Sequence, residues 1–183
     1  MKRLKSLQEA FVEGTSFKVF LLSVLITGLS YGLYKGMLDN FLAEIVGLGE
    51  MDRGVAEFFR ELPGIALVFI LAVFYLLSAQ SLYKAGAVIM LIGMSMHAFL
   101  PSYKVLAILA ICVYSLGEHI QLGMKSTLSL SYAKEGRGGE ALGAQTSCNQ
   151  IGTLAGYLVI VAAFTIGSGE GVYKLFFTVA AAL

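Results

Sequence analysis

Residues 112–156 read CVYSLGEHIQLGMKSTLSLSYAKEGRGGEALGAQTSCNQIGTLAG, and this stretch decides the fold. Its first arm is apolar, yet it carries the ionisable residues Glu118, His119 and Lys125. A charged, glycine-rich turn follows at residues 134–140, and a second apolar run carries side-chain amides. The pattern predicts two membrane helices joined by a cytoplasmic turn. A charge near the bilayer centre costs from about 3 to more than about 10 kcal/mol, so such residues usually face a cavity or a partner.

The composition is that of a membrane protein. Of the 183 residues, 57% are hydrophobic and 14% are charged, whereas soluble domains average roughly a quarter charged residues. A net charge of +1 supplies no basic face, so we expect no nucleic-acid partner. The sequence contains no phosphate-loop spacing, no serine–histidine–acid arrangement and no metal-ligand spacing. We therefore expect neither an enzyme nor a bound metal or cofactor.

Apolar runs long enough to cross a bilayer recur along the chain. We expect a cytoplasmic amphipathic segment over residues 1–15 and one transmembrane bundle over residues 16–183. The expected spans are residues 17–44, 55–79, 83–100, 103–132 and 139–166, followed by the start of a sixth span at residues 172–183. The third span, whose only ionisable residue is His97 near its end, is expected to be peripheral. The sixth run is too short to cross, which predicts a fragment of a longer protein.

Lysine and arginine residues predict the orientation, because they favour the cytoplasmic side of a membrane. With the N-terminus inside, the inner segments hold seven of them and the outer segments four. The inner set is Lys2, Arg3, Lys5, Lys18, Lys84, Lys134 and Arg137, and the outer set is Arg53, Arg60, Lys104 and Lys174. We expect a multi-pass protein of the plasma (inner) membrane with a cytoplasmic N-terminus.

Glycines recur at four-residue spacing in two of the predicted spans. The first span carries Gly28, Gly32 and Gly36, and the fifth carries Gly152 and Gly156. Small residues at this spacing let two helix backbones approach closely. We therefore expect these glycines to pack helices together.

Polar residues within the spans mark a candidate path for a substrate or for protons. Glu118, Gln121 and Lys125 share one helix face, with Lys125 expected to extend toward the cytoplasmic end, while His119 points about 100° away from Glu118. The candidate path residues are Tyr31, Lys35, Asp39, Glu118, His119, Gln121, Gln145 and Asn149. Two alternatives stay open: Lys35 and Asp39 form an ion pair at the outer interface, and Tyr31 is an interfacial anchor.

Residues 135–143, EGRGGEALG, are similar to the Glu-Arg-Gly-x-Ala-x-Gly start of helix five in the major facilitator superfamily of transporters. The order of spans and the long outer connection after the first span extend this resemblance to nearly the whole chain. It implies an all-α N-terminal bundle of five complete transmembrane helices and the start of a sixth. Helices one and four would line a cavity, two and five would flank it, and three would be peripheral. The partner would be the C-terminal six-helix half of the same protein, which this sequence lacks.

The resemblance also points to the cytoplasmic turn that holds Lys134, Glu135 and Arg137. The sequence departs from the superfamily pattern at two places. Residues 77–86 lack the acid and the arginine cluster that the superfamily carries between helices two and three. The fourth span has an acid and a histidine where the superfamily often has an arginine.

These observations predict transmembrane transport of a small solute by alternating access. We expect the transport to be secondary active, with proton binding at Glu118 or Asp39 as the coupling step. The alternative is a non-transporting membrane scaffold or sensor with the same fold, which the degenerate signature at residues 77–86 favours. Both signs of charge occur along the path, so the sequence leaves the substrate and the coupling ion open.

Overall fold

The computed structural model describes residues 15–183, and in this range it contains six helices and no strand. The helices are α2 (Thr15–Glu44), α3 (Glu50–Val73), α4 (Ala79–Phe99), α5 (Lys104–Ser131), α6 (Gly138–Ile166) and α7 (Glu170–Ala182). This confirms the expected all-α fold. Apart from Thr15, the amphipathic segment predicted over residues 1–15 lies outside the described residues.

Four helices of the described chain are long and apolar enough to cross a membrane: α2 (from Ser16), α4, α5 and α6. The sequence predicted five complete spans. The difference is α3, whose apolar run is interrupted by Glu57, Arg60 and Glu61. With 13 residues, α7 is too short to cross.

The second span differs most from its predicted limits of 55–79. Helix α3 begins at Glu50, and the chain turns after Val73. The early start has a local cause: the Asp52 carboxylate accepts a hydrogen bond from the Gly49 N–H at 3.3 Å, which caps the helix. The charged residues Glu50, Asp52 and Arg53, which precede the predicted span, therefore lie in the helix itself.

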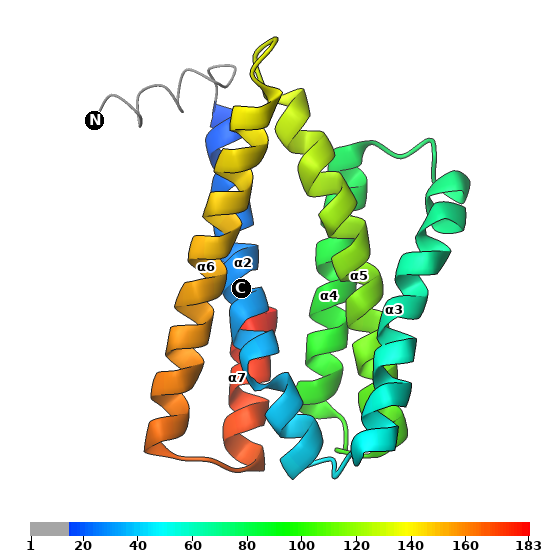
Figure 1. The fold of residues 1–183 in the computed structure, drawn as a ribbon, viewed down its shortest axis with the longest axis vertical. Coiled ribbons are helices and arrows are strands. Elements are labelled where there is room, and N and C mark those ends of the chain that lie inside the picture. Colours follow the sequence, from blue (N-terminus) through cyan, green and yellow to red (C-terminus); the bar gives the residue numbers. More distant parts are fainter. Residues whose placement is uncertain (1–14) are drawn as a thin grey trace.

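The helices form two tightly packed pairs, α2 with α6 and α4 with α5 (Figure 1). Helix α3 lies outside the second pair, and α5 is its main contact. Helix α7 packs against both α2 and α4. The Ser30 hydroxyl donates to the Ala180 carbonyl at 2.7 Å, and the Tyr173 hydroxyl donates to Glu44 at 2.8 Å. Through α7, the two pairs are joined into one bundle.

Glycines set the close approach of α2 and α6. A Cβ at Gly28 would collide with the carbonyl oxygen of Asn149, and one at Gly32 with that of Thr153. From the other side, a Cβ at Gly156 would lie 2.6 Å from the carbonyl oxygen of Leu29. Only glycine allows the backbones to lie this close.

The prediction that the third span is peripheral is wrong. Helix α4 packs against both α5 and α7, and its His97 is only 3% exposed. The His97 ring stacks on Phe177 with a centroid distance of 5.0 Å and lies edge-on to Phe41 at 5.6 Å. The cause of the close packing is again glycine, since a Cβ at Gly93 would lie 2.6 Å from the backbone nitrogen of Tyr114. The peripheral helix of the described bundle is α3.

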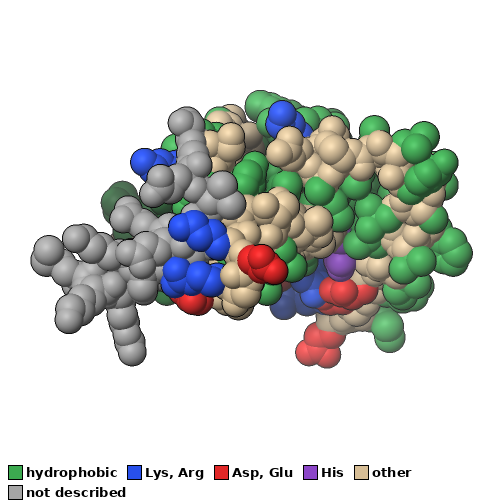
Figure 2. Space-filling view, turned by 90° about the horizontal axis from the view of Figure 1, so that it is seen from above, with side chains coloured by type: hydrophobic (Ala, Val, Ile, Leu, Met, Phe, Trp, Pro, Cys, Tyr) green, Lys and Arg blue, Asp and Glu red, His purple; other side chains and the backbone are tan. Residues whose placement is uncertain are grey.

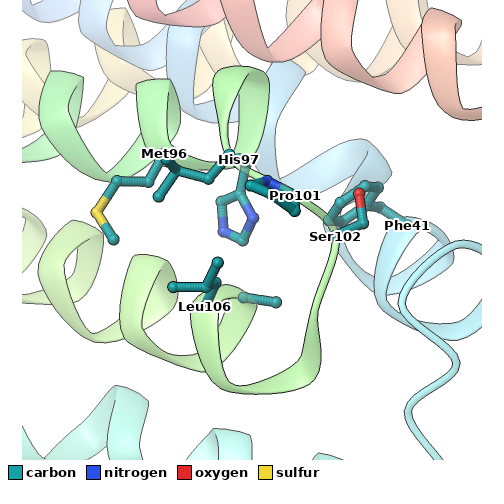
Figure 3. A pocket seen from close by; sticks show the side chains of 8 residues that line it. Phe41, Met96, His97, Pro101, Ser102 and Leu106 are labelled. Atoms are coloured by element: carbon teal, nitrogen blue, oxygen red, sulfur yellow. The ribbon is translucent and has the colours of Figure 1, made fainter.

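A cavity of about 10 Å³ lies beside His97, where α4 turns into α5 (Figure 3). Pro101, Ser102 and Leu106 contribute to its wall. A space of this size holds about one water molecule. The His97 Nε2 atom is buried and has no hydrogen-bond partner among the described residues.

The outer surface of the bundle is strongly apolar. Figure 2, which looks onto the end where α5 turns into α6, shows hydrophobic side chains along the rim on the side of α3. On α3 the exposed apolar residues include Ile65, Val68, Phe69 and Val73, and on α6 they include Leu154, Leu158 and Val161. Such a surface suits a bilayer, and it agrees with a multi-pass membrane protein.

Candidate functional site

A polar cavity of about 240 Å³ lies in the middle of the bundle, between α2, α4, α5 and α6. Its wall is formed by Thr27, Tyr31, Met90, Glu118, Gln121, Leu122, Lys125, Asn149, Gln150 and Thr153. Glu118 comes 14 residues after the first residue of the 28-residue helix α5, which places it about 21 Å along the helix axis. The carboxylate is therefore as far from either end of α5 as that helix allows.

Helix α5 supplies the charged wall. Glu118, Gln121 and Lys125 all line the cavity, as expected from their shared helix face. The Lys125 Nζ donates to the Asn149 side-chain oxygen at 3.0 Å, and the Gln121 amide donates to the Tyr83 carbonyl at 3.4 Å. The prediction that Lys125 extends toward the cytoplasmic end is wrong. The residue is 9% exposed, because Asn149 on α6 holds its ammonium inside the bundle.

Glu118 lies half-buried in the cavity wall. Within the described residues its carboxylate makes no hydrogen bond and no ion pair. Lys35, Arg60 and Lys125 interact with its charge at longer range, as does His119 when it is protonated. The oxygens of this carboxylate therefore stay free to accept hydrogen bonds from a ligand.

The structure brings together half of the eight predicted path residues. Tyr31, Glu118, Gln121 and Asn149 line the cavity, whereas the other four do not. Lys35 lies one turn beyond Tyr31 and is half-buried.

Asp39 and Gln145 lie away from the cavity wall. Asp39 is exposed near the end of α2, and its backbone carbonyl accepts a hydrogen bond from Arg53 at 3.3 Å. No ion pair forms between Lys35 and Asp39 in the described part of the chain, so that alternative is wrong. Gln145 is buried one turn before Asn149.

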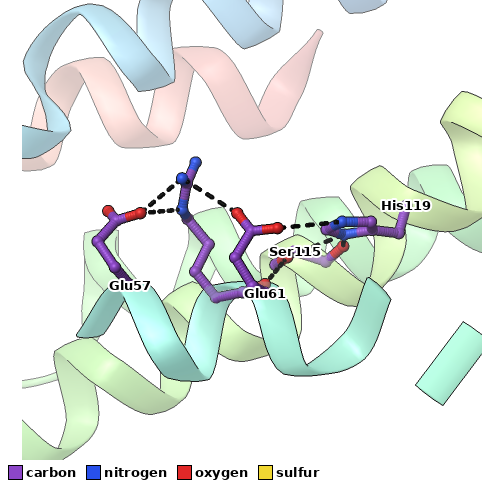
Figure 4. Close-up of polar contacts among 5 residues, drawn as sticks. Glu57, Glu61, Ser115 and His119 are labelled. Carbon is purple, nitrogen blue, oxygen red and sulfur yellow. Dashed lines mark hydrogen bonds and ion pairs between the residues drawn. The ribbon is translucent and has the colours of Figure 1, made fainter. Parts of the chain in front are cut away.

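His119 faces α3 rather than the cavity (Figure 4). Its Nδ1 lies 2.9 Å from the Ser115 carbonyl oxygen and 3.1 Å from the Ser115 hydroxyl oxygen. The same hydroxyl donates to the backbone carbonyl of Arg60 on α3. On the other side of the ring, Nε2 lies 3.9 Å from the Glu61 carboxylate, and a Cβ at Gly64 would lie 2.6 Å from it. His119 therefore fills a gap that Gly64 leaves open.

Arg60 connects two carboxylates on α3 (Figure 4). Its guanidinium lies 2.5 Å from Glu57 and 3.1 Å from Glu61. The two glutamate side chains are 57% and 58% exposed. Charged groups are costly in hydrocarbon, so we expect this face of α3 to lie against water or protein rather than lipid.

The predicted path residues did not include several residues of the cavity wall, although Lys125 was placed on the face of Glu118: Thr27, Met90, Leu122, Lys125, Gln150 and Thr153. A usable signal exists for two of them. Lys125 shares the face of Glu118, and Thr153 lies four residues after Asn149 on α6. For Met90 the sequence holds no such signal, because its place depends on how α4 packs.

The turn between α5 and α6 lies at the end of the bundle, far from this cavity. Lys134 and Glu135 are exposed there, and Arg137 pairs with Glu140 at 2.5 Å. In the described chain no three histidine, cysteine or acidic residues lie together as a metal site would require.

No protein-family model, curated protein or solved structure matches the chain, so its function is inferred from the geometry of this cavity.

Proposed function

We propose that this chain forms part of a solute pathway through a membrane, in a secondary transporter that works by alternating access. The observation that carries the proposal is the polar cavity at mid-depth between membrane-length helices, with Glu118 and Lys125 in one wall. Ionisable residues inside a membrane are expensive and usually mark substrate, ion or proton pathways. A scaffold would have little reason to bear their cost.

The pairing of the helices supports the proposal. The chain divides into two units of three helices, α2–α4 and α5–α7, in which α2 corresponds to α5, α3 to α6 and α4 to α7. If each helix is exchanged for its counterpart, the α2–α6 pair becomes the α5–α3 pair, which also packs together. The same exchange turns the α4–α5 pairing into α7–α2 and leaves α4–α7 unchanged. The chain reverses direction at each connection, so α2 and α5 run in opposite directions (Figure 1).

This pattern is typical of inverted-topology repeats, which build many secondary transporters around a site at the repeat interface. The polar cavity lies between α2 and α5, the first helices of the two units. Together with the similarity of residues 135–143 to the major facilitator superfamily, it leads us to assign the chain to the N-terminal half of such a transporter. Its partner is then a C-terminal six-helix half.

The proposed orientation places the N-terminus and the α5–α6 turn in the cytoplasm of a cell bounded by the plasma (inner) membrane. Lys18, Lys84, Lys134 and Arg137 lie at this end of the bundle. Figure 2 shows basic side chains on the same end. Excess lysine and arginine favour the cytoplasmic side.

Water access to the cavity tests the proposal. In a variant without Cys112 and Cys148, single cysteines are placed at Gln150, which lines the cavity, and at its neighbour Ile151, which is exposed on the outer surface. The two positions have nearly the same depth and differ by about 100° around α6. A membrane-impermeant thiol reagent is then added to both sides of the membrane.

We expect rapid modification of the cysteine at position 150 and little at position 151, because thiols ionise in water and not in lipid. Equal modification at both positions, or none at either, would contradict an aqueous pathway. That outcome would favour the membrane scaffold or sensor.

A further inference from the structure

We propose that the solute held in this cavity is a small zwitterion, with its cationic group at Glu118 and its anionic group at Lys125. The inference rests on the proposed transport function and deepens it by naming a substrate class. Three features of the cavity carry it: a free carboxylate, an ammonium with unused donors, and their spacing along one helix face.

The first feature is the free carboxylate. Glu118 lines the cavity and has no hydrogen bond or ion pair among the described residues, although Lys35, Arg60 and Lys125 interact with its charge at longer range. Their side chains stop short of contact, so space for a ligand cation remains beside the carboxylate. Tyr31 lines the same cavity and offers an aromatic face, to which ammonium groups are attracted.

The second feature is the buried ammonium of Lys125. A lysine Nζ carries three donors, and here one is used by the neutral side chain of Asn149 at 3.0 Å. Asn149 supplies no countercharge, and the residue is only 9% exposed. A buried charge is costly unless it is paired. An anionic group on the ligand would supply both the countercharge and the missing acceptors.

The third feature is the spacing. Glu118 and Lys125 are seven residues apart, which separates their Cα atoms by about 10.5 Å along the helix axis. Gln121 lies between them on the same face and also lines the cavity. A compact molecule that carries an ammonium at one end and a carboxylate at the other bridges this gap once both side chains reach toward it. The volume of about 240 Å³ limits the ligand to a small molecule.

Other solute classes fit the charges less well. A neutral polyol leaves both Glu118 and Lys125 without a countercharge. A cation pairs with Glu118 and brings a second positive charge toward Lys125, whereas an anion does the reverse. Of these classes, only a zwitterion satisfies both residues at once.

The test uses the full-length protein in proteoliposomes and a panel of labelled solutes of similar size. The panel contains small amino acids with an ammonium at one end and a carboxylate at the other, their N-acetyl derivatives as anions, their amides as cations, and a neutral polyol. We expect uptake of the zwitterions, with uptake of the other three classes at least tenfold lower. Three variants are compared with the wild type: Glu118→Gln, Lys125→Met and, as a charge-loss control in the exposed turn, Lys134→Met.

The variants are compared by their preference among the solute classes, which a merely structural role of Glu118 or Lys125 would not change. We expect Glu118→Gln to lose zwitterion uptake at least tenfold and to shift the preference toward the N-acetyl anions. Lys125→Met should shift it toward the cationic amides, and Lys134→Met should leave the selectivity of the wild type unchanged. The comparison of solute classes in the wild type needs no variant, so the test remains decisive even when a variant fails to fold.

The outcomes separate the two proposals. Wild-type uptake confined to anions, to cations or to the polyol would overturn the zwitterion while leaving transport intact. Failure of every solute class, together with no labelling of a cysteine at position 150, would overturn transport itself.

Discussion

Replacing Gly152 by alanine is expected to force α2 and α6 apart. A Cβ at this position would collide with the carbonyl oxygen of Leu25 and would lie 2.8 Å from the backbone nitrogen of Leu29. Both atoms belong to the backbone, so no side chain can rotate away to make room. The crossing can accept the methyl group only if one helix moves as a whole.

The magnitude follows from two opposing contributions. Alanine is better than glycine in a helix interior by about 1 kcal/mol. Overpacking costs about 1–3 kcal/mol when neighbours adjust, and the upper end applies here because only backbone faces the new methyl. We therefore expect a net loss of about 2 kcal/mol in the free energy of unfolding.

The matched control is Gly143→Ala on the same helix, where a Cβ meets nothing within 4 Å. It keeps the propensity gain of about 1 kcal/mol and lacks the collision. The two variants should then differ by about 3 kcal/mol, or roughly 6–12 °C in unfolding temperature for a chain of this size. The measurement is thermal unfolding of both purified proteins in one detergent. A Gly152→Ala protein that unfolds at or above the temperature of Gly143→Ala would refute the close approach of α2 and α6.

Three further changes test other contacts. Ser115→Ala removes the hydroxyl that donates to the Arg60 carbonyl and should lower the unfolding free energy by about 1 kcal/mol. An unchanged unfolding temperature would contradict this contact between α3 and α5. His97→Phe removes a buried nitrogen without a partner. Leaving such a group unpaired costs the folded state about 1–3 kcal/mol, so the unfolding temperature of the variant should rise. A fall would indicate that a bound water pairs with this nitrogen in the wild type. The hydrogen bond from Lys104 holds the pKa of Asp52, in the first turn of α3, below its usual value. The stabilisation from this pair is therefore fully present above the unfolded pKa and is lost as pH falls through the folded one. The stability advantage of wild type over Asp52→Asn should be small at pH 7, begin to fall at about pH 4 and vanish at lower pH, whereas a constant advantage would contradict the ion pair.

The sequence was a good guide to the long helices. The limits of α2, α5 and α6 fall within two residues of the predicted spans at 17–44, 103–132 and 139–166. Hydropathy marks these helices because apolar residues recur along the whole length of each one. Helix α3 was predicted less well: the charged residues 50–54 were left in the connection, and the helix ends at Val73 rather than at residue 79.

The candidate site was only partly predictable, because it depends on contacts between distant helices. Periodicity placed Glu118 and Gln121 on one face, and both line the cavity. The burial of Lys125 depends on Asn149, which lies 24 residues later on α6. The pairing of His119 on α5 with Glu61 on α3 depends on how these two helices pack. Nothing in the local sequence of either helix indicates that the other lies against it.

The role of α4 could have been read from its glycines. Gly86 and Gly93 are seven residues apart and therefore share a face. A Cβ at Gly86 would lie 2.9 Å from the carbonyl oxygen of Gly117, and one at Gly117 would lie 2.7 Å from the backbone nitrogen of Met90. Hydropathy alone made α4 look like a helix without neighbours, while its small residues indicate a close partner.

Three consecutive residues of α5 face three different surroundings. Gly117 packs on α4, Glu118 lines the cavity, and His119 lies against α3. The 100° step between neighbouring helix residues produces this division. Since a close glycine contact leaves no gap between α4 and α5, we expect the two helices to move as one body. Helix α3 is joined to that body by the hydrogen bond from Ser115 to the Arg60 carbonyl, by the contact of His119 with Glu61 and by the ion pair of Lys104 with Asp52.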